Sequence, residues 1–164
     1  MKKGSFAAIL GAWLALPLVA FAQFTFKPNF TPNGSNLTVS GFSGGGVVNI
    51  PSVANGGLPV TDIGPSLCSN NRYVTDVIIP GSITNIGVFA FDGCTALTNV
   101  IIMPNNGLTI GESAFCECQS LTSLSLGEGV TTINETAFQY CTELSLLTIP
   151  DSVTCDANRR VRPI

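Results

Sequence analysis

The sequence predicts a β-rich solenoid, a right-handed stack of about four coils with short parallel strands and a β cap at its N-terminal end. The first observation is a repeated pair, Ala-Phe, at residues 90–91, 114–115 and 137–138, in steps of 24 and 23 residues. The second is that a Cys follows each Phe by three residues and an Ile precedes each Ala by four. A unit of 23 residues has too few apolar side chains to bury a core alone, so neighbouring units must stack.

Each unit opens with a short apolar run that predicts one strand. The runs begin at Val74, Leu97, Leu121 and Leu144, and each has the spacing L-x-x-L-x-L. The last two apolar residues are two apart, so they point to one face of a strand. Strands of successive coils then pair in parallel at about 4.8 Å. The 24-residue step predicts one extra residue near Met103–Asn105. The predicted inward positions of one coil are Val74, Val77, Ile79, Ile83, Ile86 and Phe91, and the Phe column is expected to form an aromatic spine.

A period in the low twenties with L-x-x-L-x-L is a leucine-rich repeat signature. The phrases VTDVIIPGSITNIGVFAFDGCTA, LTNVIIMPNNGLTIGESAFCECQS and LTSLSLGEGVTTINETAFQYCTE resemble the BspA-like leucine-rich repeat of bacterial cell-surface proteins. The resemblance covers roughly residues 47–154, which predicts a leucine-rich repeat solenoid over that range. It implies a non-catalytic module that binds a protein or glycan in adhesion or recognition.

Residues 1–22 have the features of a secretory signal peptide. Lys2 and Lys3 form a basic start, Phe6–Phe21 is apolar, and an A-x-A site precedes Gln23. A membrane anchor is the alternative, but the apolar stretch is short and contains a Pro. We therefore expect a secreted or cell-surface protein. No later stretch is long enough to span a membrane, so no integral membrane segment is expected in the mature chain.

Residues 23–46 are expected to form the lead-in and cap. Leu37–Phe42 predicts a strand, paired as a hairpin with Val47–Ile50, while Phe24–Phe30 is expected to be a loose lead-in. The first coil, residues 47–71, is a degenerate copy of the repeat. In it Leu67 takes the Ala position, Cys68 the Phe position and Asn71 the Cys position.

The repeat stops after Thr154, and residues 155–164 read as an irregular basic tail with three Arg. A genuine short tail and a non-native end both remain open. A stack without a closing repeat predicts end-to-end self-association. This motivates the alternative function of a structural or self-assembling envelope protein.

Composition argues against catalysis. The chain has no His, which removes Ser-His-Asp, Cys-His and His-ligated metal sites together. Loss of Lys2 and Lys3 would leave five basic residues against ten acidic ones, a net charge of −5, which argues against nucleic acid as a partner. The acidic residues are scattered, so no enzyme activity, metal or cofactor is expected.

The six cysteines have two interpretations. Cys94, Cys118 and Cys141 share one repeat position, within disulfide reach by distance, but parallel side chains favour small buried residues over bridges. Cys116 and Cys155 fall outside the pattern and are expected to be exposed.

The outward strand positions are the candidate binding site, because repeat proteins use such extended surfaces for partners. Ile78, Ile101 and Leu146 would add exposed apolar area. Thr and Ser equally suit an exposed sheet without any ligand, and a Thr ladder also suggests a flat ice-binding face. The candidate residues are Thr75, Asp76, Ile78, Thr98, Asn99, Ile101, Thr122, Ser123, Ser125, Ser145, Leu146 and Thr148.

Overall fold

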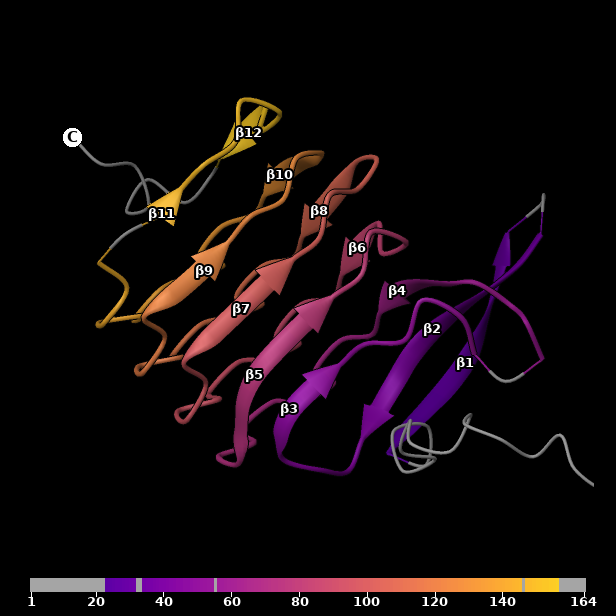
Figure 1. Ribbon diagram of the computed structural model, residues 1–164, viewed down its shortest axis with the longest axis horizontal. Helices are drawn as coiled ribbons and strands as arrows, with labels where there is room; N and C mark the ends of the chain where they lie inside the picture. The colour runs from indigo at the N-terminus through magenta and orange to yellow at the C-terminus, as the bar shows by residue number, and fades with distance from the viewer. Residues whose placement is uncertain (1–22, 32–33, 55, 146, 157–164) are drawn as a thin grey trace, which may run out of the picture.

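The computed structural model describes residues 23–31, 34–54, 56–145 and 147–156; the predicted signal peptide and most of the basic tail lie outside them. The described chain winds into a solenoid of about four coils with two sheets, and it contains no helix (Figure 1). No described segment is therefore a helix long and apolar enough to cross a membrane.

The predicted apolar runs form the first sheet, which is parallel throughout. Its strands are β3 (Gly46–Asn49), β5 (Val74–Ile79), β7 (Asn99–Ile102), β9 (Ser123–Ser125) and β11 (Leu147–Thr148). They are paired in the order β11-β9-β7-β5-β3. Val77 lies opposite Val100, which lies opposite Leu124, so like positions stack over like positions as the repeat predicted.

A second parallel sheet runs along the stack at the Ile-Gly positions. It contains β4 (Val60–Ile63), β6 (Asn85–Ile86), β8 (Leu108–Ile110), β10 (Val130–Ile133) and β12 (Cys155–Asp156). Sequence reasoning placed the Ile residues inside but predicted no strands here. The pairing of β12 with β10 carries this sheet two residues past Thr154, where the repeat pattern ends.

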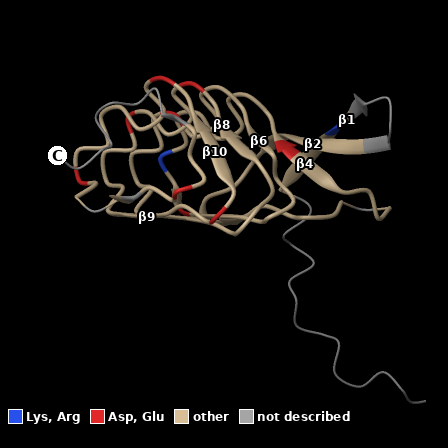
Figure 2. Ribbon diagram, turned by 90° about the horizontal axis from the view of Figure 1, so that it is seen from above, with Lys and Arg blue, Asp and Glu red and all other residues tan. Residues whose placement is uncertain are grey.

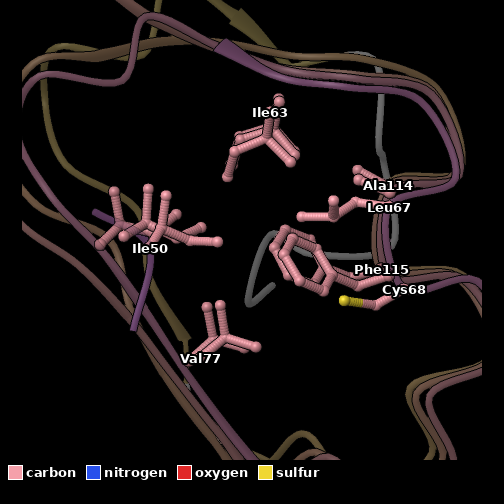
Figure 3. Close-up of a cluster of buried hydrophobic side chains, with 14 of the residues drawn as sticks. Ile50, Ile63, Leu67, Cys68, Val77, Ala114 and Phe115 are labelled. Carbon is pink, nitrogen blue, oxygen red and sulfur yellow. The ribbon is translucent and has the colours of Figure 1, made fainter. Parts of the chain in front are cut away.

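The core consists of columns of buried side chains, with one column for each inward position of the repeat. The predicted inward residues Val74, Val77, Ile79, Ile83, Ile86 and Phe91 are all fully buried. The rings of Phe91 and Phe115 are 5.1 Å apart and those of Phe115 and Phe138 are 5.4 Å apart, nearly parallel, which confirms the aromatic spine. In the first coil Leu67 and Cys68 are buried, and in the view along the coils they project over Ala114 and Phe115 of the third coil (Figure 3). Cys68 N donates to Ala90 O at 2.7 Å, as Phe91 N donates to Ala114 O, which confirms the degenerate alignment.

The N-terminal cap differs from the prediction. The segment expected to be a loose lead-in is a strand, β1 (Phe24–Thr31), which forms an antiparallel hairpin with β2 (Gly34–Phe42). β2 then pairs in parallel with β4 of the second sheet, not with β3. Phe24 anchors the hairpin, since it is 8% exposed and its ring lies 5.1 Å from that of Phe42.

The third coil differs from the prediction of a single extra residue near Met103–Asn105. Ile79 is followed by the next buried position, Ile83, after four residues, whereas Ile102 is followed by Leu108 after six. β8 is in turn one residue shorter than β10, and the register between them shifts at Val130/Thr132. Two residues are therefore inserted before β8 and one is lost within it.

The Ala-Phe corner has an unusual backbone that repeats in every coil. Residues two before and two after the Phe position have positive φ, including Phe89 (57°), Thr136 (57°) and Tyr140 (61°). This conformation is strained for bulky or β-branched residues. It holds because corner amides donate to the next coil, as from Phe91 N to Ala114 O at 2.8 Å and from Phe115 N to Ala137 O at 2.8 Å.

Candidate binding face

The candidate face is the outer surface of the first sheet, and a ladder of threonines borders it. Thr98 Oγ1 donates to Thr75 O at 3.1 Å, and Thr122 Oγ1 donates to Thr98 O at 3.2 Å. Each hydroxyl therefore bonds the preceding coil. The ladder is part of the structure of the stack, and its hydroxyl protons are already engaged.

A polar column runs across the middle of the face. Asp76 lies opposite Asn99 in β7, and Asn99 lies opposite Ser123 in β9. The carboxylate of Asp76 accepts from Thr75 Oγ1 at 2.8 Å and from Asn99 Nδ2 at 3.4 Å. Ser123 is exposed, and its hydroxyl makes no hydrogen bond to a described residue, so the column changes from an anchored carboxylate to a neutral hydroxyl along the stack.

The apolar strip is shallower than predicted. Ile78 and Ile101 are cross-strand neighbours, but both are half-buried, because their branched side chains pack against one another on the sheet. The next positions of that column are Ser125 and Thr148. The apolar part of the predicted site is therefore limited to two coils.

The end of the face is described only in part. Ser145 is exposed, Leu146 lies outside the described residues, and the side chain of Thr148 is not described. The N-terminal end carries residues that sequence reasoning did not include. Val47, 60% exposed, lies opposite Asp76, and the exposed Asn49 lies opposite Ile78. Their place in the degenerate first coil could have indicated them.

The charge of the described chain is strongly acidic. Five of the seven basic residues lie outside it, which leaves Lys27 and Arg72 against ten carboxylates. The carboxylates are spread over several sides of the stack (Figure 2). No group of three or more His, Cys, Asp or Glu in the described part could hold a metal ion.

The repeated cysteines are free thiols that hydrogen-bond to the backbone. Cys94 Sγ donates to Cys68 O at 3.1 Å, Cys118 Sγ to Phe91 O at 3.2 Å and Cys141 Sγ to Phe115 O at 3.1 Å. Burial raises the pKa of Cys94 to about 12. Hydrogen bonding to the neighbouring Cys141 thiol, together with burial, raises the pKa of Cys118. The raised pKa values make Cys94 and Cys118 structural thiols and poor nucleophiles. The hydrogen bond with Cys118 lowers the pKa of Cys141.

Cys116 was expected to be exposed, and this was wrong. Its exposure is 9%, since it follows Phe115 into the corner and stacks against the neighbouring coil. Burial, then the nearby carboxylate of Asp92, raises its pKa to about 11. The side chain of Cys155 is not described.

The parallel sheets, the 23-residue coil and the buried columns define a leucine-rich repeat solenoid. The model of the BspA type leucine-rich repeat region matches residues 61–158 in six copies. The chain belongs to that family.

Solved structures agree with this assignment. A leucine-rich cell surface protein from Faecalibacterium prausnitzii A2-165 is 35% identical with a TM-score of 0.71, over 83% of this chain and 38% of that one. A leucine-rich repeat protein from Bacteroides ovatus is 32% identical with a TM-score of 0.65, over 79% and 35%. The leucine-rich repeat protein of T. pallidum is 27% identical with a TM-score of 0.68, over 79% and 60%.

The chain thus spans about a third to three fifths of the length of these proteins. No curated protein matches the chain.

Proposed function

We propose that this protein is an exported, non-catalytic binding module, which holds a protein or glycan partner on the outer face of the first sheet at the cell surface or outside the cell. The observation that carries the proposal is the in-register column Asp76–Asn99–Ser123. It places a carboxylate, an amide and a hydroxyl at about 4.8 Å intervals on a flat sheet. Such spacing suits the hydroxyls of a glycan or the backbone of an extended peptide.

Three further features support this reading. The cell-surface description of the Faecalibacterium relative is consistent with export, and the N-terminal residues have the composition of a signal peptide. The Asp76 carboxylate is positioned by Thr75 and Asn99 before any partner arrives, which lowers the entropy lost on binding. The half-buried pair Ile78 and Ile101 adds a small apolar contact beside the polar column.

A printed glycan array and a phage-displayed random-peptide library provide the test. The purified protein is expected to give a saturable ligand whose Kd rises tenfold or more in the triple variant Asp76→Ala/Asn99→Ala/Ser123→Ala. The matched control is Thr95→Ala/Gln119→Ala/Glu143→Ala, which changes three side chains of the corner, off the first sheet. If a ligand binds the Asp76→Ala/Asn99→Ala/Ser123→Ala variant as tightly as it binds the parent protein, its site does not lie on this face.

Export has its own test, because it does not depend on the face. Intact mass of the protein recovered from the medium or cell surface is expected to start at Gln23, after the A-x-A site. Retention of the full chain inside the cell would contradict export.

The structural alternative predicts end-to-end association of stacks. Light scattering over a hundredfold concentration range separates the two ideas, since a binding module remains one size and a self-assembling protein grows.

A further inference from the structure

A second surface, remote from the first sheet in the coil, has the shape of a binding groove. It lies where the second sheet turns into the Ala-Phe corner and has a volume of about 680 Å³. Its lining comes from four successive coils. One wall is the column of residues that follows the Gly position of each coil, and it contains Pro65, Val88, Glu112 and Glu135.

The groove exists because two glycines leave its floor without side chains. Gly87 N donates to Ile63 O at 2.8 Å and Gly111 N to Ile86 O at 2.9 Å, which brings the coils into close contact. A Cβ on Gly111 would lie 2.5 Å from Ile86 O, so a larger residue at this position requires the local backbone to shift. Asn134 occupies the Gly position of the next coil and lines the groove at that end.

The wall changes in chemistry along its length. Pro65 is exposed and Val88 is 41% exposed, so the first two coils present an apolar surface. Glu112 and Glu135 are exposed and sit on adjacent coils, as the bond from Ser113 N to Glu135 O shows. No basic residue lines the groove to neutralise them.

We propose that this groove binds an extended basic peptide segment, with apolar residues against Pro65 and Val88 and Lys or Arg side chains paired with Glu112 and Glu135. Three coil steps of about 4.8 Å give a wall of about 14 Å, which matches four or five residues of extended chain at about 3.3 Å each. The site is separate from the proposed face of the first sheet.

The probes are two fluorescein-labelled pentapeptides, Leu-Val-Gly-Arg-Arg and its reverse, because the groove sets no chain direction in advance. Leu-Val-Gly-Glu-Glu tests whether binding requires positive charge, and Ser-Ser-Gly-Arg-Arg tests whether it requires the apolar residues. Fluorescence polarisation is measured with the whole protein and with Glu112→Gln/Glu135→Gln. The matched control is Glu117→Gln/Glu143→Gln, which removes the same charge from exposed corner positions outside the groove.

We expect one basic apolar peptide to bind saturably, with about a tenfold loss in the first double variant and less than twofold in the control. Val88→Ser should weaken that peptide and leave Ser-Ser-Gly-Arg-Arg unchanged. The triple variant of the first sheet should bind as the parent protein does. Equal losses in both double variants would reduce the effect to net charge and overturn the proposal. The proposal is also overturned if Ser-Ser-Gly-Arg-Arg binds as tightly as the basic apolar peptide, or if no peptide binds saturably.

Discussion

The aromatic spine makes a quantitative prediction about where stability resides. Phe115 is fully buried and stacks on a ring at each side, at 5.1 and 5.4 Å, whereas Phe138 is 6% exposed and has one described ring neighbour. Truncating a buried Phe to Ala costs about 3–5 kcal/mol of unfolding free energy. Each stacked pair contributes about 0.5–1.5 kcal/mol of its own.

Phe115→Ala should therefore lower the unfolding free energy by about 4 kcal/mol. Phe138→Ala should cost less by about one ring pair, or 0.5–1.5 kcal/mol. Urea unfolding followed by far-UV circular dichroism and by tyrosine fluorescence measures both variants. Coincident transitions by the two probes are the control for two-state behaviour, which a coil-by-coil stack can lose when its middle is weakened.

The reasoning fails if Phe115→Ala costs no more than Phe138→Ala, since ring number would then not matter. A cost below about 2 kcal/mol would show that the neighbouring rings close over the cavity.

Three smaller predictions concern the backbone and the thiols. Thr98→Val removes the hydroxyl bond to Thr75 O and should cost about 0.5–1 kcal/mol by urea unfolding; no loss would show that the ladder is incidental. Gly111→Ala should cost about 1–3 kcal/mol, because its Cβ meets Ile86 O, and an unchanged midpoint would contradict the close approach. Alkylation of Cys94 at pH 8 should be about a thousandfold slower than for a thiol of pKa 9.0, measured by mass spectrometry. Because folding raises the pKa of the Cys94 thiol, its contribution to the unfolding free energy is fully present below pH 9 and is lost as the pH rises toward 12. Rapid labelling of Cys94 at pH 8 would refute the raised pKa.

The interior could be predicted from sequence because it must repeat. A residue such as Ile86 or Phe91 lies over its equivalent in the next coil, so phase alone identifies it as buried. The strands of the first sheet could be predicted in the same way, because apolar residues two apart point to the same face of a strand. The second sheet did not, because strands as short as β6 have polar outward residues and resemble loops.

The cap was mispredicted for a different reason. Phe24–Thr31 occurs once, so no alignment supports it, and it contains Lys27 and Pro28, which are unfavourable in the middle of a strand. At a sheet edge both are acceptable, and they discourage further pairing. Edge position is a tertiary property that local sequence does not express.

The candidate face was predictable as a set of positions but not as a surface. Sequence placed Asp76 and Asn99 outward, and the register confirms that they are neighbours. It could not show that Thr98 is engaged in a bond to the previous coil, or that Ile78 and Ile101 shield one another. The groove was missed because it depends on the backbone approach at Gly87 and Gly111.

The stacking of equivalent positions also indicates which residues determine recognition. Interior columns are restricted to apolar residues whose combined size fills the coil, as when Leu67 and Cys68 replace the Ala-Phe pair in the first coil, because an uncompensated change leaves a void or a clash against the next coil. Outward columns have no such requirement, and two of them vary strongly: Asp76–Asn99–Ser123 on the first sheet and Pro65–Val88–Glu112–Glu135 at the groove. Both change chemistry along the stack axis, so an elongated partner would meet a defined order of groups. Exchanging Val88 and Glu112 would retain the composition of the groove wall and interrupt its apolar-to-acidic order, so a partner that recognises this order should bind the exchanged protein more weakly.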